Sequence, residues 1–530
     1  MMLSQIKPRL KGEVLRDSSS RERYSVAECV YRILPVGVVL PACAEDVLEV
    51  LRLAREEGIS ITARGAGSAV AGQSVGSGII LDFSRHMDSI LEINGEEQWA
   101  RVQPGVVLGE LNRRLAPQRL RFAPDPSSSD FCTLGGMIAN NAGGARSVRY
   151  GATRDHILSL SVALSNGEFV ETRPLPRAEL SAGSGETLHR LSLGLECLVA
   201  PRREVIRSAM PQVRRIASGY ELLRSTSDDR LDLTQLLVGS EGTLAVTLEA
   251  KLRLTRLPGG TATALIHFRD LDAAGEGVLQ ALKHHPSALE VLDQSFLDLV
   301  REAGQDEVRA LPEATEAVLI VELEGTDAGE AAARLERLGR ELVRPGPAEG
   351  IVPGLDARTR DRIWEIRKAA SPILTSRQKG LHSTRFIEDA CVPTPRFPEF
   401  LRAAREILRH HRLQAAIFGH AGDAILHVNP LLDPADPNIA LKMERIAAEY
   451  SEMVLSLGGA LSGEHGDGRL RTPFLGRAFG TVADIYREVK ELFDPLSLLN
   501  PGIKVHDGHS RMTDHLDLGP RPLHRGIAIW

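Results

Sequence analysis

The segment 61–73 constrains the fold of this chain more than any other, because it carries glycines at positions 65, 67 and 72 between two short apolar runs. Ile59–Ile61 predicts a strand before the segment, and Ile79–Asp82 predicts a strand after it. A glycine-rich turn between strands lets backbone N–H groups converge on an anion, since no Cβ stands in the way. The same pattern also occurs in plain tight turns. The segment is therefore compatible with either a diphosphate site or a structural turn until the rest of the chain is considered.

The composition is that of a globular protein with ample length for several cores. The chain has 530 residues, of which 43% are hydrophobic and 25% charged, and such a length predicts roughly two to four domains. A net charge of -6 provides no basic field, so we expect no nucleic-acid partner. No run approaches the ~18 apolar residues of a membrane span, and the first residues lack a signal-peptide core, so a cytoplasmic location is expected. The 5 cysteines are not closely paired, which argues against a disulfide framework, a zinc ribbon or an iron–sulfur site within this chain.

Two later segments have the same richness in glycine and hydroxyl residues. Residues 122–145 include Thr133-Leu-Gly-Gly-Met-Ile-Ala-Asn-Asn-Ala-Gly-Gly-Ala145, and residues 236–246 include Gly239-Ser-Glu-Gly-Thr-Leu244. The first of these is too apolar for a linker. It is either a tightly packed turn and helix or a backbone surface pressed against a flat cofactor. Around these segments the sequence predicts helices at 44–57, 108–115 and 187–199, and a hairpin at 157–172 whose Asn-Gly turn suits type I′ geometry.

The pattern changes at Pro258. Strands are expected at 264–268, 288–292 and 317–323, and helices at 271–284 and 328–343, which together make two β-α-β units. This order predicts a ferredoxin-like layer that forms a second domain. Further helices are expected at 361–368, 397–410, 438–457 and 481–493. The polar residues beyond Val505 are expected to be poorly ordered, and 173–186 is expected to be a surface loop.

A candidate metal site lies in the last third of the chain. His420 and His427 flank an Ala-Gly-Asp turn, which would join two strands and bring the imidazoles together. With the carboxylate of Glu464 they offer the ligands of an open divalent site, although the 16 histidines make a chance pairing the alternative. His465 would point away from that site and act as a base with a pKa near neutral. Arg367, on a predicted helix, could clamp a carboxylate bidentately or be an ordinary solvated arginine.

Several motifs occur together in a recognisable order. They are Arg64-Gly-Ala-Gly-Ser68, Pro124-Asp-Pro126, Thr133-Leu-Gly-Gly136, Asn140-Asn-Ala-Gly-Gly144, Gly151-Ala-Thr-Arg-Asp155, Gly239-Ser-Glu-Gly-Thr-Leu244 and Asn500-Pro-Gly502. In this order they resemble the PCMH-type FAD-binding domain of the vanillyl-alcohol oxidase superfamily. The branch they resemble contains glycolate oxidase, D-lactate dehydrogenase and D-2-hydroxyglutarate dehydrogenase. The resemblance runs from about Tyr31 to Lys504.

The resemblance implies an α+β fold and a set of cofactor contacts. It implies a two-part FAD-binding domain (1–257), a ferredoxin-like substrate-binding cap (258–460), a C-terminal segment that returns to the FAD domain (461–505) and a flexible tail (506–530). Ser68 stands where some relatives have a histidine bonded to the flavin, so non-covalent FAD is expected. The expected FAD contacts are Arg64, Gly65, Ala66, Gly67, Ser68, Gly72, Pro124, Asp125, Thr133, Gly135, Gly136, Asn140, Gly143, Gly144, Arg154, Asp155, Glu241, Gly242, Thr243, Leu244 and Asn500.

The resemblance also implies the oxidation of a 2-hydroxy acid, expected to be the D enantiomer, to the 2-oxo acid. His420, His427 and Glu464 match the ligands of a divalent metal (zinc, manganese or iron), and Arg367 matches the arginine that holds the substrate carboxylate. The metal would lower the pKa of the substrate hydroxyl. His465 would take that proton while a hydride passes to flavin N5.

Two departures from the family pattern bear on substrate and partner. Ile387-Glu388 stands where the hydroxyglutarate enzymes have a lysine near the distal carboxylate, and Gly422-Asp-Ala-Ile425 replaces Gly-Asp-Gly-Asn. Parts of the chain resemble a longer bacterial type that continues into an iron–sulfur domain. We therefore expect a separate iron–sulfur or quinone-linked electron acceptor, which could hold the protein peripherally at a membrane; a homo-oligomer is also compatible with the sequence.

Three other functions are weighed against this one. The protein could be an oxidoreductase of the same fold that acts on another alcohol, with structural histidines. It could be a non-catalytic flavin subunit of a glycolate-oxidase-like complex, although such a subunit has no use for the His420, His427, Glu464 and His465 set. A nucleotide-binding module without redox chemistry fits the sequence least well.

Overall fold

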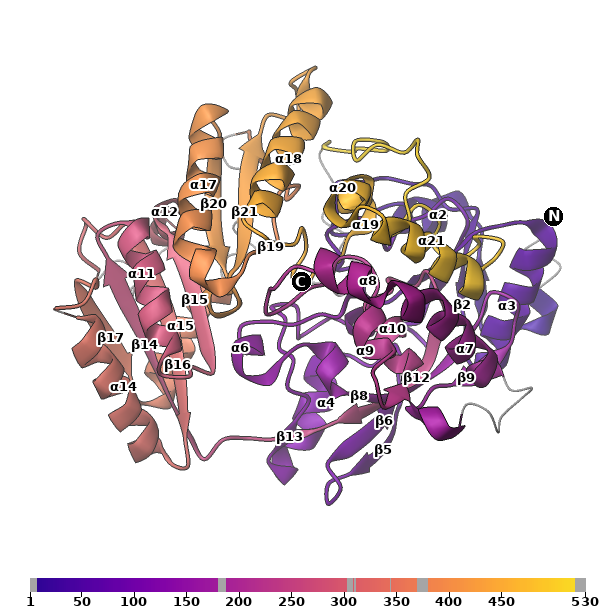
Figure 1. Ribbon diagram of the computed structural model, residues 1–530, viewed down its shortest axis with the longest axis horizontal. Coiled ribbons are helices and arrows are strands. Elements are labelled where there is room, and N and C mark those ends of the chain that lie inside the picture. The colour runs from indigo at the N-terminus through magenta and orange to yellow at the C-terminus, as the bar shows by residue number, and fades with distance from the viewer. Residues whose placement is uncertain are drawn as a thin grey trace.

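Two α+β bodies lie side by side in the computed structural model of the chain, and the C-terminal segment lies over the N-terminal body (Figure 1). The structure describes residues 7–179, 187–302, 308, 311–343, 345–368 and 380–519.

The N-terminal body begins with a four-stranded sheet in the order β1-β2-β4-β3, formed by Glu13–Leu15, Gly37–Leu40, Ile79–Asp82 and Ile61–Arg64. The helix α3 (Ala44–Glu57) connects β2 to β3, as the sequence predicts, and ends at Gly58, whose φ of 65° is left-handed. Its buried face packs on the sheet through Val47, Val50 and Leu51. Because β3 and β4 are parallel, the chain between them, which includes the glycine-rich segment, has to run back from the end of β3 to the start of β4.

A five-stranded antiparallel sheet completes this body, in the order β5-β6-β12-β8-β9. Its strands are Ile90–Asn94, Trp99–Val102, Val246–Arg253, Ile157–Ala163 and Phe169–Glu171. The hairpin β8–β9 is present, but the type I′ turn is a wrong prediction. Only Gly167 takes a left-handed φ, of 83°, while Asn166 does not. Gly167 N–H bonds to Leu164 O, and Leu164 N–H bonds to Glu168 O, so the turn is one residue longer than a two-residue loop.

The predicted helices of this body are present as α4 (Leu108–Leu115) and α7 (Thr187–Val199), and the segment after Thr133 forms the short helix α5 (Leu134–Asn140). The C-terminal helix α21 (Val482–Phe493) packs against α7 and shares its apolar core. This packing returns the end of the chain to the first body. The region 173–179 is less exposed than expected, because Leu175 is buried in a two-residue pairing with Leu231; residues 180–186 lie outside the described residues.

An eight-stranded sheet forms the second body. Its main path is β17-β14-β16-β15-β20-β21-β18, formed by Gly350–Gly354, Gly260–Phe268, Ala317–Gly325, Ala288–Asp293, Gln414–Gly419, Ile425–Leu432 and His382–Ser383, and β19 (Ala390–Cys391) pairs with β21. The order of the first four strands is that of two interleaved β-α-β units. The ferredoxin-like layer predicted from the sequence is therefore confirmed.

Helices cover both faces of this sheet (Figure 1). Along β14, Ala264 and Ile266 face one core while Leu265 faces the other, as the two-residue period of a strand requires. The first core is covered by α11 (Leu271–Leu282), α14 (Ala328–Leu342), α17 (Phe397–His410) and α18 (Ile439–Ser456). The second is covered by α12 (Gln294–Glu302) and α15 (Ala357–Lys368).

The described part of the tail, 506–519, is packed against the N-terminal body, which differs from the expected flexible tail. Tyr31 Oη donates to the Met512 carbonyl at 2.6 Å, and Met512 is buried. Arg32 pairs with Asp517 at 2.6 Å. The polar composition concealed this packing because only three apolar side chains carry it, those of Met512, Leu516 and Leu518, together with backbone pairing of Leu516 with Tyr31. Residues 520–530 lie outside the described residues.

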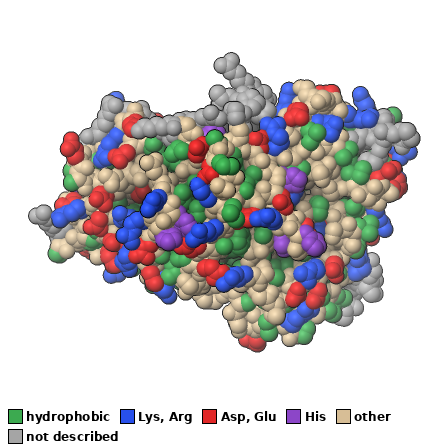
Figure 2. All heavy atoms as spheres, turned by 90° about the horizontal axis from the view of Figure 1, so that it is seen from above, with side chains coloured by type: hydrophobic (Ala, Val, Ile, Leu, Met, Phe, Trp, Pro, Cys, Tyr) green, Lys and Arg blue, Asp and Glu red, His purple; other side chains and the backbone are tan. Residues whose placement is uncertain are grey.

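Basic and acidic side chains are interspersed over the face shown in Figure 2. Within the described ranges, the longest apolar helices are too short or too polar to cross a bilayer.

Candidate active site

A cavity of 1160 Å³ opens between the two bodies and the C-terminal segment. Such a volume exceeds the roughly 300–1,000 Å³ of ordinary small-molecule sites and suits a dinucleotide together with a small substrate. The first body contributes the glycine-rich segment after β3, the segment around α5 and residues 240–247. The second body contributes the end of α15, residues 382–385 and the β20–β21 turn, and the C-terminal segment contributes Glu464 and His465.

The glycine-rich segment is shaped by close contacts that exclude side chains. A Cβ on Gly65 would lie 1.9 Å from Oγ1 of Thr133, the residue that caps α5. Gly67 has a φ of 73°, and a Cβ there would meet the Arg64 guanidinium. Arg64 itself donates to the Val26 carbonyl at 2.9 Å, so its charged end anchors the segment. The glycines are thus required because the side chains of Thr133 and Arg64 lie directly against this backbone at the cavity wall.

About half of the expected FAD contacts line the cavity. These are Arg64, Gly65, Ala66, Gly67, Ser68, Thr133, Gly135, Gly136, Asn140, Glu241 and Gly242. The remaining residues do not line it: Gly72, Pro124, Asp125, Gly143, Gly144, Arg154, Asp155, Thr243, Leu244 and Asn500.

The residues behind the wall hold its segments together. Arg154 donates to the carbonyls of Gln235 and Val238, and so supports the loop that carries Glu241. Asn500 Nδ2 donates to the carbonyls of Gln73 and Glu241 at 2.8 and 2.9 Å, joining two glycine-rich segments. The sequence pattern alone could not distinguish such supports from contacts, because both occur in the same motifs.

Three imidazoles converge on the Glu464 carboxylate. Glu464 Oε1 lies 2.8 Å from His420 Nε2, 3.5 Å from His427 Nε2 and 3.5 Å from His465 Nε2. The turn between β20 and β21 brings His420 and His427 together as predicted, with ring centroids 5.2 Å apart. His465 stacks on His427 at 5.0 Å.

Two buried carboxylates fix the orientation of these imidazoles. Glu290 accepts from His420 Nδ1 at 2.7 Å. Glu388 accepts from His427 Nδ1 at 3.0 Å and from His465 Nδ1 at 2.7 Å. Because each Nδ1 carries the proton of its hydrogen bond, each Nε2 is turned towards Glu464.

The site concentrates negative charge that a cation must balance. Burial lowers the pKa of His420, but Glu290 and Glu464 outweigh it and raise that pKa to about 10. Burial opposes ionisation of Glu388, yet His465 and Arg471 hold its pKa well below the usual range. Arg215 supports Glu464 in the same way from 2.8 Å. His420, whose pKa is raised in this way, carries a balancing positive charge near neutral pH.

His465 differs from the sequence expectation in two respects. It points into the Glu464 centre instead of away from it. Burial lowers its pKa, but the carboxylates of Glu388 and Asp389 raise it to about 9, so a pKa near neutral is not what the structure shows. The sequence could not reveal either feature, because Glu388 and Asp389 are brought to His465 by tertiary packing.

Arg367 lines the cavity near the end of α15 and is not an ordinary solvated residue, since only 8% of it is exposed. Its Nε donates to Glu290 Oε2 at 2.6 Å, and its guanidinium lies over the Phe418 ring. Glu290 therefore bridges Arg367 and His420.

Sequence reasoning missed Glu290 and Gln73, and it noted Glu388 only as a departure from the family. A signal for Glu290 was available, since it is an acid within the otherwise apolar strand 288–292, and a buried acid needs a partner. Gln73 and Glu388 carried no comparable signal.

Comparison with known proteins supports the relationship that this geometry suggests. A model described as "FAD binding domain" matches residues 35–173, and one described as "FAD linked oxidases, C-terminal domain" matches residues 257–503. The glycolate oxidase subunit GlcD of Bacillus subtilis is 30% identical over 89% of this chain and 89% of its own length. The chain belongs to the FAD-linked oxidase family.

Other relatives of the FAD-linked oxidase family are longer. The D-2-hydroxyglutarate dehydrogenases of Pantoea ananatis and Escherichia coli are 35% and 34% identical over 93% of this chain. The chain spans about half the length of these relatives, 50% in each case.

Solved structures show that the fold of the family is present here. The 4-ethylphenol oxidase of Gulosibacter chungangensis has a TM-score of 0.69 at 15% identity and covers 95% of this chain and 97% of its own. An alkyldihydroxyacetonephosphate synthase has a TM-score of 0.64 at 16% identity, covering 94% of this chain and 85% of its own.

The residues present fit both an FAD and a divalent metal. The cavity has the size for FAD, and its wall includes glycines whose missing Cβ leaves backbone close to the side chains of Thr133 and Arg64. For a metal, His420, His427 and Glu464 place ligand atoms within 4.8 Å of one another. The carboxylate behind each histidine is the arrangement that orients imidazoles towards metals.

Proposed function

We propose that this protein is an FAD-dependent dehydrogenase that oxidises a D-2-hydroxy acid to the 2-oxo acid. The observation that carries the proposal is the convergence of His420, His427 and His465 on Glu464 within the cavity that the glycine-rich segment borders. Bound FAD would accept the hydride, and a divalent metal on His420, His427 and Glu464 would act as a Lewis acid.

His465 would take the proton of the substrate hydroxyl at Nε2 from its neutral form. Burial lowers the pKa of His465, Glu388 and Asp389 raise it to about 9, and a divalent cation on His420, His427 and Glu464 would lower it again. Glu388 accepts from the Nδ1 of His465 and so leaves Nε2 as the exchanging atom. The same carboxylate would stabilise the imidazolium once the proton has moved. Glu388 also accepts from Arg471 at 2.6 Å, which fixes its position against both imidazoles.

Arg367 would hold the substrate carboxylate. Its side chain borders the cavity beside His420, and Lys368 and Arg385 also line the cavity. These cationic side chains favour an anionic substrate. Because Glu388 is committed to two imidazoles and Arg471, it does not replace the lysine that the hydroxyglutarate enzymes have in this segment.

The remaining expectations belong to the same proposal. FAD would be held without a covalent bond at Ser68, which lines the cavity. Electrons would pass to a separate iron–sulfur or quinone-linked acceptor, and 1–257 and 258–460 would act as FAD-binding and substrate-binding domains. Because GlcD is a subunit of a glycolate oxidase, a non-catalytic flavin subunit is the alternative function. The complete imidazole–carboxylate centre favours catalysis.

The decisive experiment is anaerobic reduction of the bound flavin. The purified, FAD-loaded protein is mixed with D- and L-2-hydroxy acids, and the visible flavin band is followed. We expect bleaching by one or more D-2-hydroxy acids. A flavoprotein that no hydroxy acid bleaches would contradict the proposal, and full turnover after complete metal removal by a chelator would contradict the metal.

A further inference from the structure

The backbone that carries Glu464 and His465 is bound by the carboxylate of Asp389. Asp389 Oδ2 accepts from the His465 N–H at 2.8 Å and from the Ser462 hydroxyl at 2.5 Å. Asp389 Oδ1 accepts from the Glu464 N–H at 3.1 Å. Residues 462–468 are called the base turn below. One buried side chain therefore holds the first half of the base turn, which contains both a candidate metal ligand and the candidate base.

The main chain of Asp389 is attached to the strand that carries His427. Its N–H donates to the Leu426 carbonyl on β21 at 2.8 Å, and its carbonyl accepts from the Gly463 N–H at 2.8 Å. Asp389 also has a φ of 71°, a left-handed conformation that aspartate and asparagine adopt more readily than most residues. Because Leu426 directly precedes His427, Asp389 sets the distance between His427 and the base turn.

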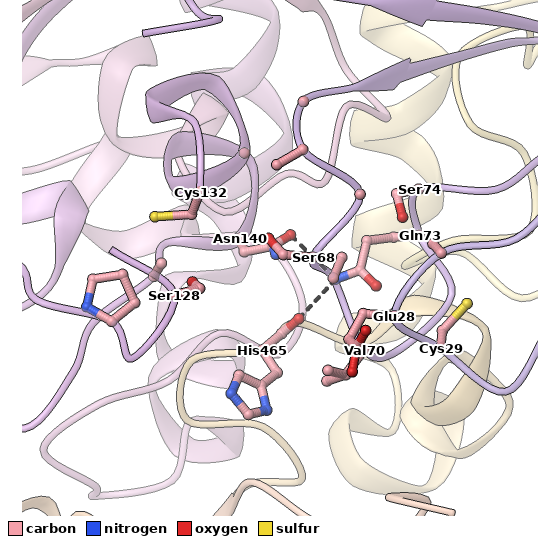
Figure 3. A pocket seen from close by; sticks show the side chains of 18 of the residues that line it. Glu28, Cys29, Ser68, Val70, Gln73, Ser74, Ser128, Cys132, Asn140 and His465 are labelled. Carbon is pink, nitrogen blue, oxygen red and sulfur yellow. Dashed lines mark hydrogen bonds between the residues drawn. The ribbon is translucent and has the colours of Figure 1, made fainter. Parts of the chain in front are cut away.

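The first body holds the base turn from the other side. Glu241 accepts from the Asp467 N–H at 2.7 Å. Gln73 Nε2 donates to the His465 carbonyl at 2.7 Å (Figure 3). Glu241 and Gln73 line the cavity, whereas Asp389 does not line it and is 0% exposed. Asp389 therefore acts on the base turn from a place that neither a substrate nor a cofactor in the cavity reaches.

A metal ligand and a base act together only if the backbone that carries them is fixed, because outer partners orient the groups that touch the metal. The relative positions of Glu464, His465 and His427 all depend on Asp389. We infer that Asp389 is a positioning residue, which presents the Glu464 carboxylate and the His465 imidazole to the centre. The inference rests on the proposed function only in taking the Glu464 centre as a metal site.

The test compares Asp389→Asn with the wild-type protein. Asparagine keeps the size of the side chain and its tolerance of a left-handed φ, but one acceptor oxygen becomes an NH2 group that cannot accept. If the amide oxygen stays with the His465 N–H, the NH2 group faces the Glu464 N–H, so a donor meets a donor. The base turn then has to move.

Cobalt(II) is the probe, added to the FAD-loaded protein and followed by its d–d band, which lies at longer wavelength than the oxidised flavin band. We expect the affinity of Asp389→Asn for cobalt to fall roughly 10- to 100-fold, as for the loss of other outer partners of a metal site. The shape of the band should also change, because Glu464 is displaced, while FAD content stays unchanged. Wild-type cobalt affinity, or an equal loss of cobalt and FAD, would overturn the inference.

Asp46→Asn is the matched control. Asp46 is 2% exposed, and its carboxylate accepts from the backbone N–H groups of Lys11, Gly12 and Ala42. It lies on α3 and does not line the cavity. The same substitution there should leave cobalt affinity unchanged. A loss equal to that of Asp389→Asn would show that the effect belongs to buried aspartates in general and would overturn the inference.

A second variant decides the matter if Asp389→Asn does not fold. The Ser462 hydroxyl donates to Asp389 and accepts from the Gly466 N–H at 2.9 Å, so Ser462→Ala removes part of the same hold on the base turn. We expect cobalt affinity to fall in the same direction, by roughly threefold to tenfold, as for one hydrogen bond. Unchanged cobalt affinity in Ser462→Ala would then overturn the inference.

Amide hydrogen exchange separates this inference from the proposed function. The N–H groups of Glu464 and His465 should exchange faster in Asp389→Asn than in wild type, because the variant no longer holds both of them. This measurement requires neither a metal nor a hydroxy acid. A wild-type protein that binds no cobalt would count against the proposed metal site alone, and unchanged exchange at Glu464 and His465 would overturn the role of Asp389.

Discussion

At the scale of single residues, the site works through histidines whose two nitrogens have different partners. In His420, His427 and His465, Nδ1 faces a buried carboxylate and Nε2 faces Glu464. The orientation of each imidazole therefore does not depend on the ligand. Preorganisation of this kind lets binding energy be used for the reaction and not for ordering side chains.

His465→Ala should retain FAD and lose flavin reduction. The substitution removes the group proposed to take the hydroxyl proton, and general-base catalysis is worth roughly 100- to 10,000-fold. The rate is measured by stopped-flow bleaching with the best hydroxy acid. His410→Ala provides the control, because His410 is an exposed residue at the end of α17. A rate within a factor of about two of wild type would remove His465 as the base.

Glu290→Gln should weaken metal binding and raise the KM for the hydroxy acid together, because one carboxylate supports both His420 and Arg367. Loss of a partner of this kind typically costs roughly 10- to 100-fold in metal affinity. Metal content after dialysis and KM are the two measurements. Glu276→Gln, exposed on α11, should change neither. Wild-type metal retention and KM in Glu290→Gln would refute the bridge.

At the scale of elements, the cofactor wall depends on a close contact between the glycine-rich segment after β3 and the start of α5. Gly65 leaves room there for Thr133 Oγ1, and Asn500 ties the glycine-rich segment to the loop of Glu241 from behind. The helices and strands could be placed from their periodicity, because that pattern is local. The meeting of their ends is a long-range contact.

Gly65→Ala should weaken FAD binding by displacing this contact. The new Cβ would lie 1.9 Å from Thr133 Oγ1, so α5 or the glycine-rich segment has to move. Overpacking of this kind costs roughly 1–3 kcal/mol. FAD affinity and thermal unfolding are measured beside Gly476→Ala, where a Cβ would meet nothing within 4 Å. FAD affinity equal in the two variants would argue against the close contact as a determinant of the site.

At the scale of the whole molecule, the cavity exists only because the two bodies are held together. Arg146 of the first body pairs with Glu322 on β16 of the second, with Nη2 to Oε2 at 2.7 Å, and also with Asp125. The guanidinium lies over the Trp364 ring, three residues before Arg367 on α15. This connection fixes the second body, and with it Arg367, relative to the cofactor wall.

The coupling between Arg146 and Glu322 is measurable by a double-mutant cycle. Arg146→Met and Glu322→Gln should each reduce the free energy of unfolding, and we expect an interaction energy of about 1–3 kcal/mol. The exposed pair Arg113–Glu110 on α4 is the comparison, with about 0–1 kcal/mol expected. Denaturant unfolding of the FAD-free chain provides the values. Additive effects of the two substitutions would show that the pair does not hold the bodies together.

The sequence by itself determined the elements, the ferredoxin-like layer and the residues His420, His427, Glu464, His465 and Arg367, all of which border the cavity. These followed from periodicity, turn chemistry and motifs, which are local properties of the chain. Tertiary structure alone decided that Arg154 and Asn500 support the wall from behind, that His465 faces Glu464, and that Glu290, Glu388 and Gln73 belong to the site. Most of these features depend on contacts between residues that are far apart along the chain. Gln73 and His465, for example, are separated by 392 residues. The glycine-rich segment illustrates both contributions. Its glycines predict from sequence that another group lies close to this backbone, and only the fold shows that the group at Gly65 is the Thr133 side chain.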